Sequence, residues 1–517
     1  MFRFAALIAC AVTCTLAGPL QPYLWPAPAD MTQGTTRTYV QPRSPDTFFI
    51  FKGPTKTTPN TLTRAFERYR TLTFPHVVTP GPHGAKSGRN GGAVSAAELP
   101  SVIVHVEHVD ESHPQIDTDE SYRLDVPNDG SSAVISAPNV YAAMRGLETL
   151  SQLVGFDFAA QAFFVDHTPI RIQDRPRFPH RGLMIDTGRH FQPLASIRSV
   201  IDSLPYAKIN VLHWHMSDSQ SFPFESKTYP RLWAGAYSDF EKYTQADIAA
   251  VVEYARARGV RVVVEFDMPG HAASWCKGYP RVCPSKDCPQ PLNVADNATF
   301  DLIASVLKEC TGGQASTTDM PSGLFPDHFV HLGGDEVGTD CWTRTPSIAK
   351  WLSDRGMSAD DGYAYFVKRA ADIALAQGRR PVQWSEVYDH FKTKLDKRTV
   401  VHVWKPVTNV TAVVADGYDV LLNVGYTNVS WYLDNLDVPW DKVYENEPCR
   451  GVPEALCPKV LGGHGEMWGE TVDASDLGQT VWPRLAAIAE RLWSPRPAAA
   501  LADALPRIEY FRCLLNR

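Results

Sequence analysis

The stretch HFVHLGGDE, residues 328–336, decides the fold and poses the question of function. It starts as a short apolar run typical of a buried strand and ends in a Gly-Gly pair followed by Asp335 and Glu336. Two adjacent like charges repel, so the pair must be solvated, neutralised by a metal, or used in chemistry. The rest of the sequence must show which of these three explanations applies.

The same pattern, an apolar run that ends in an acid or an aromatic residue, recurs after residue 180. Amphipathic segments of helical period separate the runs, and this strand–helix alternation predicts a (β/α)8 TIM barrel. An open doubly wound sheet is the alternative, but it rarely needs eight such units, and no glycine-rich nucleotide motif follows a strand. The runs are GLMID (182–186), INVLHWHMSD (209–218), VRVVVEFD (260–267), HFVHLGGDE (328–336), RPVQWSE (380–386), TVVHVW (399–404), DVLLNV (419–424) and VLGGHGEMWGE (460–470).

Residues 19–170 predict a smaller α/β domain ahead of the barrel, which would then span residues 171–517. SYRLDV and SAVISA flank Asn128-Asp129-Gly130, which indicates a β-hairpin. Residues 139–154 carry apolar side chains at helical spacing and are expected to cover one sheet face, whereas the glycine-rich residues 79–96 are expected to form a loop. No catalytic pattern stands out here, so we expect a non-catalytic domain.

Residues 1–18 have the features of a secretory signal peptide, with one Arg before an apolar run and small residues at its end. A membrane anchor is the alternative, but it needs about 18–20 apolar residues. We therefore expect a protein of the secretory pathway, lysosomal, vacuolar or extracellular, without a membrane span. The net charge is −7 and no polybasic run occurs, which argues against nucleic acid or an anionic membrane as the main partner. N-glycosylation sequons occur at Asn297, Asn409 and Asn428.

The cysteines outside residues 1–18 are even in number, which suggests disulfides in a secreted chain. The short separations predict local pairs, Cys276 with Cys283 and Cys449 with Cys457. Zinc is the competing explanation, but no C-x-x-C spacing occurs.

Barrel active sites form at the carboxyl ends of the strands, so the residues that end the runs should meet at one mouth. Carboxylates bond sugar hydroxyls, and indole faces cover the apolar face of a pyranose, so a mouth of this composition predicts a carbohydrate site. The residues are Asp186, Asp218, Asp267, Asp335, Glu336, Trp384, Glu386, Trp404, Trp468 and Glu470.

A metal-dependent hydrolase is the main rival from the residues alone. His213-x-His215 is a metal-ligand spacing, and His271, His331 and Asp335 are further candidate ligands. However, this motif lies on the second run instead of the first, and no strand-end lysine offers a bridging carbamate. We therefore expect neither a metal nor another cofactor.

The successive motifs RGLMIDTGRHF, HWHMSDSQSFPFES, EFDMPGHAASW, HLGGDEV, MWGE and WPRLAAIAERLW resemble those of the family-20 glycoside hydrolases, the β-N-acetylhexosaminidases. The resemblance covers the whole barrel half in the right order. An N-terminal α/β domain is also usual in that family, and LWPAPAD near residue 25 resembles its eukaryotic members.

The resemblance implies a reaction assisted by the substrate itself, an exception to the two-carboxylate rule of retaining glycosidases. The 2-acetamido oxygen would attack the anomeric carbon and form an oxazolinium intermediate, with retention of the β configuration. Glu336 would be the general acid and then the base, kept protonated by the charge of Asp335. Asp335 would hold the acetamido N–H, and Tyr432 would bond the acetamido oxygen.

The resemblance also assigns the sugar-binding residues. Arg181 and Glu470 match the pair that holds the 3- and 4-hydroxyls, and Trp384, Trp404 and Trp468 would wall the pocket. Asp434 follows Tyr432 closely in the sequence, and this corner of the pocket offers no cationic side chain. No residue that binds a sulfated or sialylated sugar is therefore expected there.

Asp218 and His271 match a dyad that supports the general acid, whereas Asp186 and Glu386 are expected to be structural. Ser219 replaces an acid found in some relatives. Cys513 lacks the downstream partner that relatives have, so it should pair with Cys310 or stay free.

The leading hypothesis is an exo-acting β-N-acetylhexosaminidase that releases terminal GlcNAc, and GalNAc as well. A carbohydrate-binding protein on an inactive scaffold is the alternative from another class. A homodimer is expected because relatives are often dimers. Chitin fragments, N-glycans and glycolipids all remain open as substrates.

Overall fold

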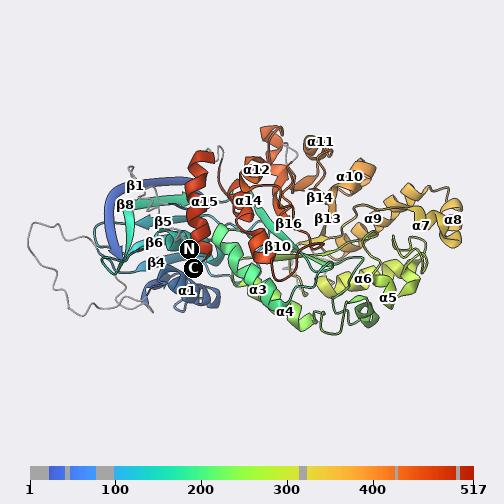
Figure 1. The fold of residues 1–517 in the computed structure, drawn as a ribbon, viewed down its shortest axis with the longest axis horizontal. Helices are drawn as coiled ribbons and strands as arrows, with labels where there is room; N and C mark the ends of the chain where they lie inside the picture. Colours follow the sequence, from blue (N-terminus) through green and yellow to red (C-terminus); the bar gives the residue numbers. More distant parts are fainter. Residues whose placement is uncertain are drawn as a thin grey trace, which may run out of the picture.

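The computed structural model describes residues 23–40, 47–76, 98–313, 323–424, 429–495 and 501–516. The expected signal peptide, the glycine-rich segment 79–96 and the sequon at Asn428 lie outside these ranges. The described residues form a sheet domain and a barrel domain that lie side by side (Figure 1).

The N-terminal domain is a mixed sheet in the order β2-β4-β6-β5-β8-β1-β3, with β7 paired to β8. The predicted hairpin is confirmed, because β5 and β6 pair antiparallel. Its last long strand, β8, runs to Asp174, so the domain extends beyond the predicted boundary at residue 170. The strands are β1 Asp30–Val40, β2 Phe49–Lys52, β3 Glu98–Leu99, β4 Val102–His108, β5 Tyr122–Val126, β6 Ala133–Asn139, β7 Gly155–Asp157 and β8 Ala162–Asp174.

Helices α1 (Asn60–Thr73) and α2 (Val140–Leu153) pack on this sheet. Helix α2 begins where the sequence predicts it, because the Asn139 side chain accepts hydrogen bonds from the N–H groups of Tyr141 and Ala142. Every residue of α2 is buried, since the helix is covered by the sheet on one side and by the barrel domain on the other.

The predicted TIM barrel is confirmed. The described residues close a parallel barrel in the order β10-β11-β12-β13-β14-β15-β16-β9. Its strands are β9 His180–Asp186, β10 Val211–Ser217, β11 Arg261–Phe266, β12 Phe329–His331, β13 Arg380–Trp384, β14 Val400–Val403, β15 Asp419–Leu422 and β16 Val460–Met467. The surrounding helices include α3 Leu194–Ser203, α4 Gln245–Arg256, α6 Asn297–Thr311, α9 Ala359–Ala376 and α14 Arg484–Trp493. The last helix, α15 (Leu501–Leu515), packs against Trp25 through Phe511.

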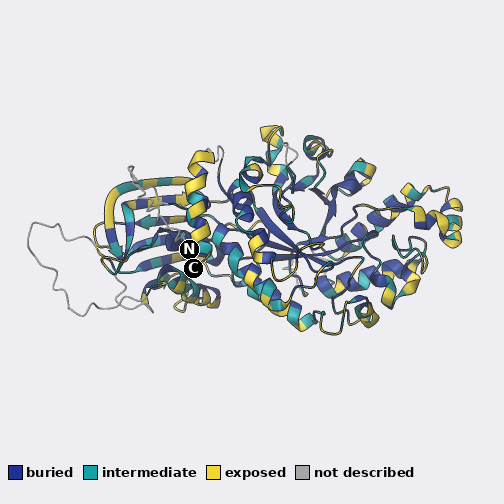
Figure 2. Cartoon of the chain, in the orientation of Figure 1, coloured by how far each residue is buried: buried dark blue, intermediate teal, exposed yellow. Residues whose placement is uncertain are grey.

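The barrel interior changes character along its axis. One layer is apolar and consists of Val211, Val263, Phe329, Val382, Val400 and Leu421. On most of the same strands the next inward-facing positions are polar yet buried, and the barrel strands in Figure 2 are mostly dark blue. These buried polar side chains are His213, His215, Glu265, His331, His402, His464 and Glu466.

A buried ionic network joins the two domains. Glu120 of the sheet domain accepts hydrogen bonds from Arg145 of α2 (2.8 Å), Arg181 of β9 (2.6 Å) and Asn210 (2.9 Å). Because these groups are almost fully buried, each charge depends on the others for compensation.

The predicted disulfides Cys276–Cys283 and Cys449–Cys457 are confirmed, and Cys288–Cys341 is added to them. Cys310 is buried and Cys513 is exposed, and among the described residues neither is paired, so of the two alternatives Cys513 stays free. Within the described ranges, no helix has the length and apolar character needed to cross a membrane.

Candidate active site

The acidic pair lies where β12 ends, at the carboxyl edge of the barrel. The strand is short because Gly333 and Gly334 both have positive φ, 64° and 101°. A side chain at Gly333 would collide with the carboxyl group of Asp267, so only glycine permits this turn. The turn leaves Asp335 nearly buried, with its side chain 10% exposed, and Glu336 projecting outward, with its side chain 58% exposed.

His271 connects the two acids to the barrel. Its Nε2 lies 3.4 Å from Glu336 Oε2 and 3.7 Å from Asp335 Oδ2, and its Nδ1 lies 3.2 Å from Asp218 Oδ1. Burial lowers the pKa of His271, but the hydrogen bond to Asp218 and the charges of Asp267 and Asp335 outweigh it and raise the pKa to about 10. His271 is therefore an imidazolium at neutral pH. Of the predicted dyad, His271 lies next to both acids, and Asp218 contacts them only through His271.

Asp267, whose role the sequence left unclear, supports the turn. Its Oδ1 accepts the N–H of Gly334 at 2.8 Å. Burial and then the charge of Asp335 raise the pKa of Asp267 well above its usual range. Asp335 Oδ1 is buried, and no described residue donates a hydrogen bond to it.

A relay of buried groups extends below Asp218. His215 donates hydrogen bonds from Nε2 to Asp218 Oδ2 (2.8 Å) and from Nδ1 to Glu265 Oε2 (2.7 Å), and, against the effect of burial, these carboxylates raise its pKa well above the usual range. Both ring nitrogens of His215 are thus engaged by carboxylates, so its predicted alternative role as a metal ligand is not supported.

The arginine of the mouth is Arg189, and the prediction of Arg181 for this place is wrong. Arg181 is the second residue of β9, at the amino end of the barrel, where it is fully buried and donates to Glu120 and to the carbonyls of Phe178 and Lys208. It faces the other domain, so it lies at the end of the barrel opposite the sugar mouth.

Arg189 follows the carboxyl end of β9. It pairs with Asp186 (3.0 Å) and Asp218 (3.0 Å), lies 3.8 Å from Glu470 Oε1, and packs its guanidinium over the Trp468 ring. Asp186 also accepts a hydrogen bond from the N–H of Gly469, so it links the loop after β9 to the loop after β16. The signal in the sequence was the position of TGRHF after the end of the strand, whereas HRG forms its first three residues.

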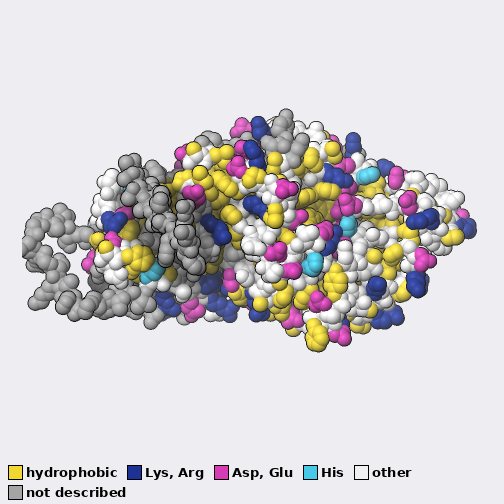
Figure 3. All heavy atoms as spheres, in the orientation of Figure 1, with side chains coloured by type: hydrophobic (Ala, Val, Ile, Leu, Met, Phe, Trp, Pro, Cys, Tyr) yellow, Lys and Arg dark blue, Asp and Glu magenta, His cyan; other side chains and the backbone are white. Residues whose placement is uncertain are grey.

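Aromatic side chains surround the other side of the mouth. Trp404 and Tyr432 are half-buried, with ring centroids 6.5 Å apart. Glu386, predicted to be structural, accepts the Trp404 Nε1–H at 2.7 Å and pairs with Lys405 at 2.6 Å. Acidic and histidine side chains gather among hydrophobic ones on the barrel half in Figure 3.

Some of the remaining predicted residues reach the rim of the mouth, and others lie beneath it and support it. Trp468 is half-buried and Glu470 is exposed, so both side chains reach the rim of the mouth. Trp384 is fully buried, donates to Glu265 at 2.9 Å and packs under Trp468, so it supports the pocket instead of presenting a face to it. Asp434 is half-buried, and burial raises its pKa to about 6.

His271, Asp335 and Glu336 lie close enough to share an ion. The positive charge of His271 opposes a cation at this place, so the site fits a proton-transfer chemistry better than a metal chemistry. A (β/α)8 barrel with a carboxylic pair, a charged histidine and indole rings at the carboxyl edge has the parts of a glycoside hydrolase.

Comparison with known proteins agrees with this class. The chain matches the family model "Glycosyl hydrolase family 20, catalytic domain" over residues 178–496 and the model "beta-acetyl hexosaminidase like" over residues 24–153. It is 42% identical to beta-hexosaminidase 1 of Arabidopsis thaliana, over 98% of this chain and 93% of that protein. It is 36% identical to beta-hexosaminidase subunit alpha of Bos taurus, over 100% and 95%.

Among solved structures, the Flavobacterium johnsoniae chitobiase has a TM-score of 0.78 and 27% identity, and the alignment covers 96% of this chain and 73% of that one. The chain therefore belongs to glycosyl hydrolase family 20, and the resemblance found in the sequence motifs is confirmed. It is a glycoside hydrolase.

Proposed function

We propose that this chain is an exo-acting, retaining β-N-acetylhexosaminidase that removes terminal GlcNAc, and GalNAc as well, from non-reducing ends. The observation that carries the proposal is the buried Asp335 Oδ1, which faces no described donor, directly beside the exposed carboxyl group of Glu336. An acetamido N–H supplies the donor that Asp335 needs, because a buried carboxylate oxygen without a hydrogen bond is costly.

In the proposed reaction, the acetamido oxygen of the substrate attacks the anomeric carbon as the glycosidic bond breaks. Glu336 gives its proton to the leaving oxygen, and the resulting oxazolinium ion is balanced by Asp335 and oriented by the hydroxyl group of Tyr432. Glu336 then takes a proton from water. The water oxygen adds to the anomeric carbon on the face from which the leaving group departed, which opens the oxazolinium ring and restores the acetamido group. Much of the rate arises from proximity, because the nucleophile is bonded to the reacting sugar.

The engagement of the other acids supports a nucleophile that belongs to the substrate. Asp186 and Asp218 hold Arg189 and backbone N–H groups, Asp267 holds the turn at Gly334, and Glu386 holds Trp404 and Lys405. None of these four is free to attack an anomeric carbon. Arg189, together with Glu470, takes the proposed role of binding the 3- and 4-hydroxyls.

The experiment compares chromogenic β-GlcNAc, β-GalNAc and β-glucoside, with a β-GlcNAc series that carries one to three fluorines on the acetamido methyl group. We expect hydrolysis of the two N-acetyl sugars only, and kcat/KM that falls steadily with fluorine number because the acetamido oxygen becomes a poorer nucleophile. Asp335→Asn should flatten this dependence. Equal activity on the β-glucoside, or no effect of fluorine, would contradict substrate assistance.

We also propose that the chain matures in the secretory pathway. Three disulfides within the described ranges and the exposed sequons Asn297 and Asn409 support this. The chain produced in a eukaryotic host should shift in electrophoretic mobility after endoglycosidase treatment, and Asn297→Gln should remove part of that shift. The homodimer stays a prediction for sedimentation analysis.

A further inference from the structure

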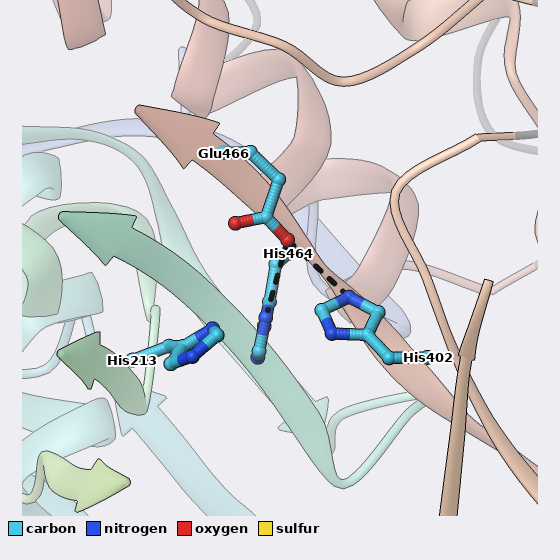
Figure 4. Close-up of side chains that lie close together, drawn as sticks. All are labelled: His213, His402, His464 and Glu466. Atoms are coloured by element: carbon cyan, nitrogen blue, oxygen red, sulfur yellow. Dashed lines mark ion pairs between the residues drawn. The ribbon is translucent and has the colours of Figure 1, made fainter. Parts of the chain in front are cut away.

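A second group of potential ligands lies inside the barrel, apart from the acids of the mouth. His213 of β10, His402 of β14, and His464 and Glu466 of β16 point toward one another (Figure 4), and we call them the barrel-core cluster. Each is at most 1% exposed. One nitrogen or oxygen atom from each lies within 4.8 Å of the corresponding atoms of the other three.

The cluster leaves several buried polar atoms without hydrogen bonds. Among the residues that the structure describes, His402 Nε2, His464 Nδ1, Glu466 Oε2 and His213 Nδ1 have no hydrogen-bond partner. Such atoms are rare in a protein core, because each one costs free energy unless a water or an ion satisfies it. Their concentration at one point indicates a bound species.

The separations inside the cluster suit ligands of one ion. His402 Nε2 lies 3.3 Å from Glu466 Oε1, and His464 Nδ1 lies 3.5 Å from the same oxygen. Neither nitrogen makes a hydrogen bond there. With zinc–ligand bonds of about 2.0–2.2 Å, the corners of a tetrahedron lie about 3.3–3.6 Å apart, so these distances match two edges of a zinc site.

The outer nitrogens of the rings are held as in metal sites. His402 Nδ1 lies 3.3 Å from His331 Nε2, and His331 Nδ1 lies 3.1 Å from Glu265 Oε1. His464 Nε2 contacts His180 Nε2, and His213 Nε2 lies 2.8 Å from Glu265 Oε2. Each cluster histidine is thus oriented by a second group, as metal-bound imidazoles usually are.

A competing group, His213 with Glu265 and His331, is less suited to bind an ion. Both oxygens of Glu265 already accept hydrogen bonds, from His215 (2.7 Å) and from Trp384 (2.9 Å). Glu466 is less committed, because it accepts one long hydrogen bond from Asn423 (3.3 Å) and its Oε2 is unpartnered within the described ranges.

We propose that His213, His402, His464 and Glu466 bind one divalent transition-metal ion, with Zn²⁺ the best match to three imidazoles and a carboxylate. Four protein ligands complete a tetrahedron and leave no position for water, which is the form of a structural site. His402 stacks on Trp384 at 4.3 Å, and Trp384 supports Trp468, so the ion would brace the floor of the sugar pocket without taking part in the reaction.

The arrangement without a metal is equally definite. The N–H of Gly333 would donate to His331 Nδ1 (3.0 Å), His331 Nε2–H would donate to His402 Nδ1, and the proton of His402 would lie on Nε2, facing Glu466. With a metal, the direction reverses and His402 Nδ1 becomes the donor. The presence of a metal therefore decides which ring nitrogen of His402 carries the proton. The experiment measures the metal content itself.

The test uses the full chain, produced with zinc in the medium and purified through a tag without histidines. Elemental analysis after desalting should find about one zinc per chain in the wild type, and less than about a tenth of that in the double variant His402→Gln, His464→Gln. The matched control is His328→Gln, a half-buried histidine just before β12 and outside the cluster, which should keep the zinc.

Stability gives a second measurement. Because the cluster is closed, the metal should come off only when the chain is unfolded with a chelator. Chain refolded without metal should melt about 10 °C lower, and added Zn²⁺ during refolding should restore the loss. Neither treatment should change the melting temperature of the double variant.

The proposal is overturned if wild-type chain holds no zinc and its melting temperature ignores added Zn²⁺, or if the double variant retains the metal. Should the double variant fail to fold, X-ray absorption at the zinc edge of the wild type decides. Four nitrogen or oxygen ligands with imidazole scattering support the cluster, whereas sulfur ligands or six-fold coordination refute it.

Discussion

Replacing each of two arginines by lysine tests where the sugar site lies. Arg189→Lys keeps the positive charge at the mouth but removes the planar fork that reaches Asp186, Asp218 and Glu470. The loss of a hydrogen bond between a charged group and a sugar hydroxyl costs about 1.5–3 kcal/mol. We therefore expect kcat/KM on β-GlcNAc to fall about 10- to 150-fold.

Arg181→Lys acts at the other end of the barrel. Arg181 donates to Glu120 (2.6 Å) and to two carbonyls (2.8 and 2.9 Å), and lysine cannot make all three bonds. Breaking a buried ion pair costs about 3–5 kcal/mol, which for a domain of roughly 340 residues corresponds to a fall in melting temperature of about 4–7 °C. The kcat/KM of the folded fraction should stay at the wild-type value.

The assay is steady-state hydrolysis of chromogenic β-GlcNAc at 25 °C, together with calorimetric melting of each variant. The reasoning is refuted if Arg181→Lys loses activity in proportion to Arg189→Lys while remaining folded. It is also refuted if Arg189→Lys hydrolyses the substrate like the wild type.

Three other predictions follow from the contacts. Glu336→Gln should lower kcat by about 10²–10⁴ without changing the melting temperature, because the side chain is 58% exposed; a loss of activity explained by unfolding would contradict this. Burial raises the pKa of Glu148 to about 7, so the native state holds a proton that the unfolded chain releases near pH 4.5. The contribution of this proton to the free energy of unfolding is complete below pH 4.5 and declines by about 3 kcal/mol as the pH rises to about 7. Denaturant titrations across this range should show the decline in the wild type and its absence in Glu148→Gln. Cys288→Ser with Cys341→Ser opens a link of sequence separation 53 and should cost about 4 kcal/mol in the same titrations, whereas an unchanged midpoint would argue against this disulfide.

Much of the fold was predictable because the signals are local. Strand runs, helical periods and the Asn-Asp-Gly turn depend on neighbours in the chain, and all the predicted barrel runs contain strands of the barrel. The acidic pair after β12 was predictable for the same reason, since barrel chemistry collects at the carboxyl ends of strands.

The errors come from where a residue stands relative to a strand end. Arg181 lies at the start of β9 and Arg189 follows its end, and only the strand bounds show that the first faces Glu120 while the second faces Glu470. Trp384 ends its strand as Trp404 nearly does, yet it is fully buried, because the depth of a ring depends on its neighbours from other strands.

By itself, the sequence determined the barrel, the domain that precedes it, the acidic pair and two local disulfides, because each of these is written in short-range pattern. Only the tertiary structure decided that burial raises the pKa of Asp267, that its carboxylate neighbours raise the pKa of His271 to about 10, and that His213, His402, His464 and Glu466 meet in the core. These properties depend on burial and on distances between side chains from different strands, which closure of the barrel sets and no local pattern records.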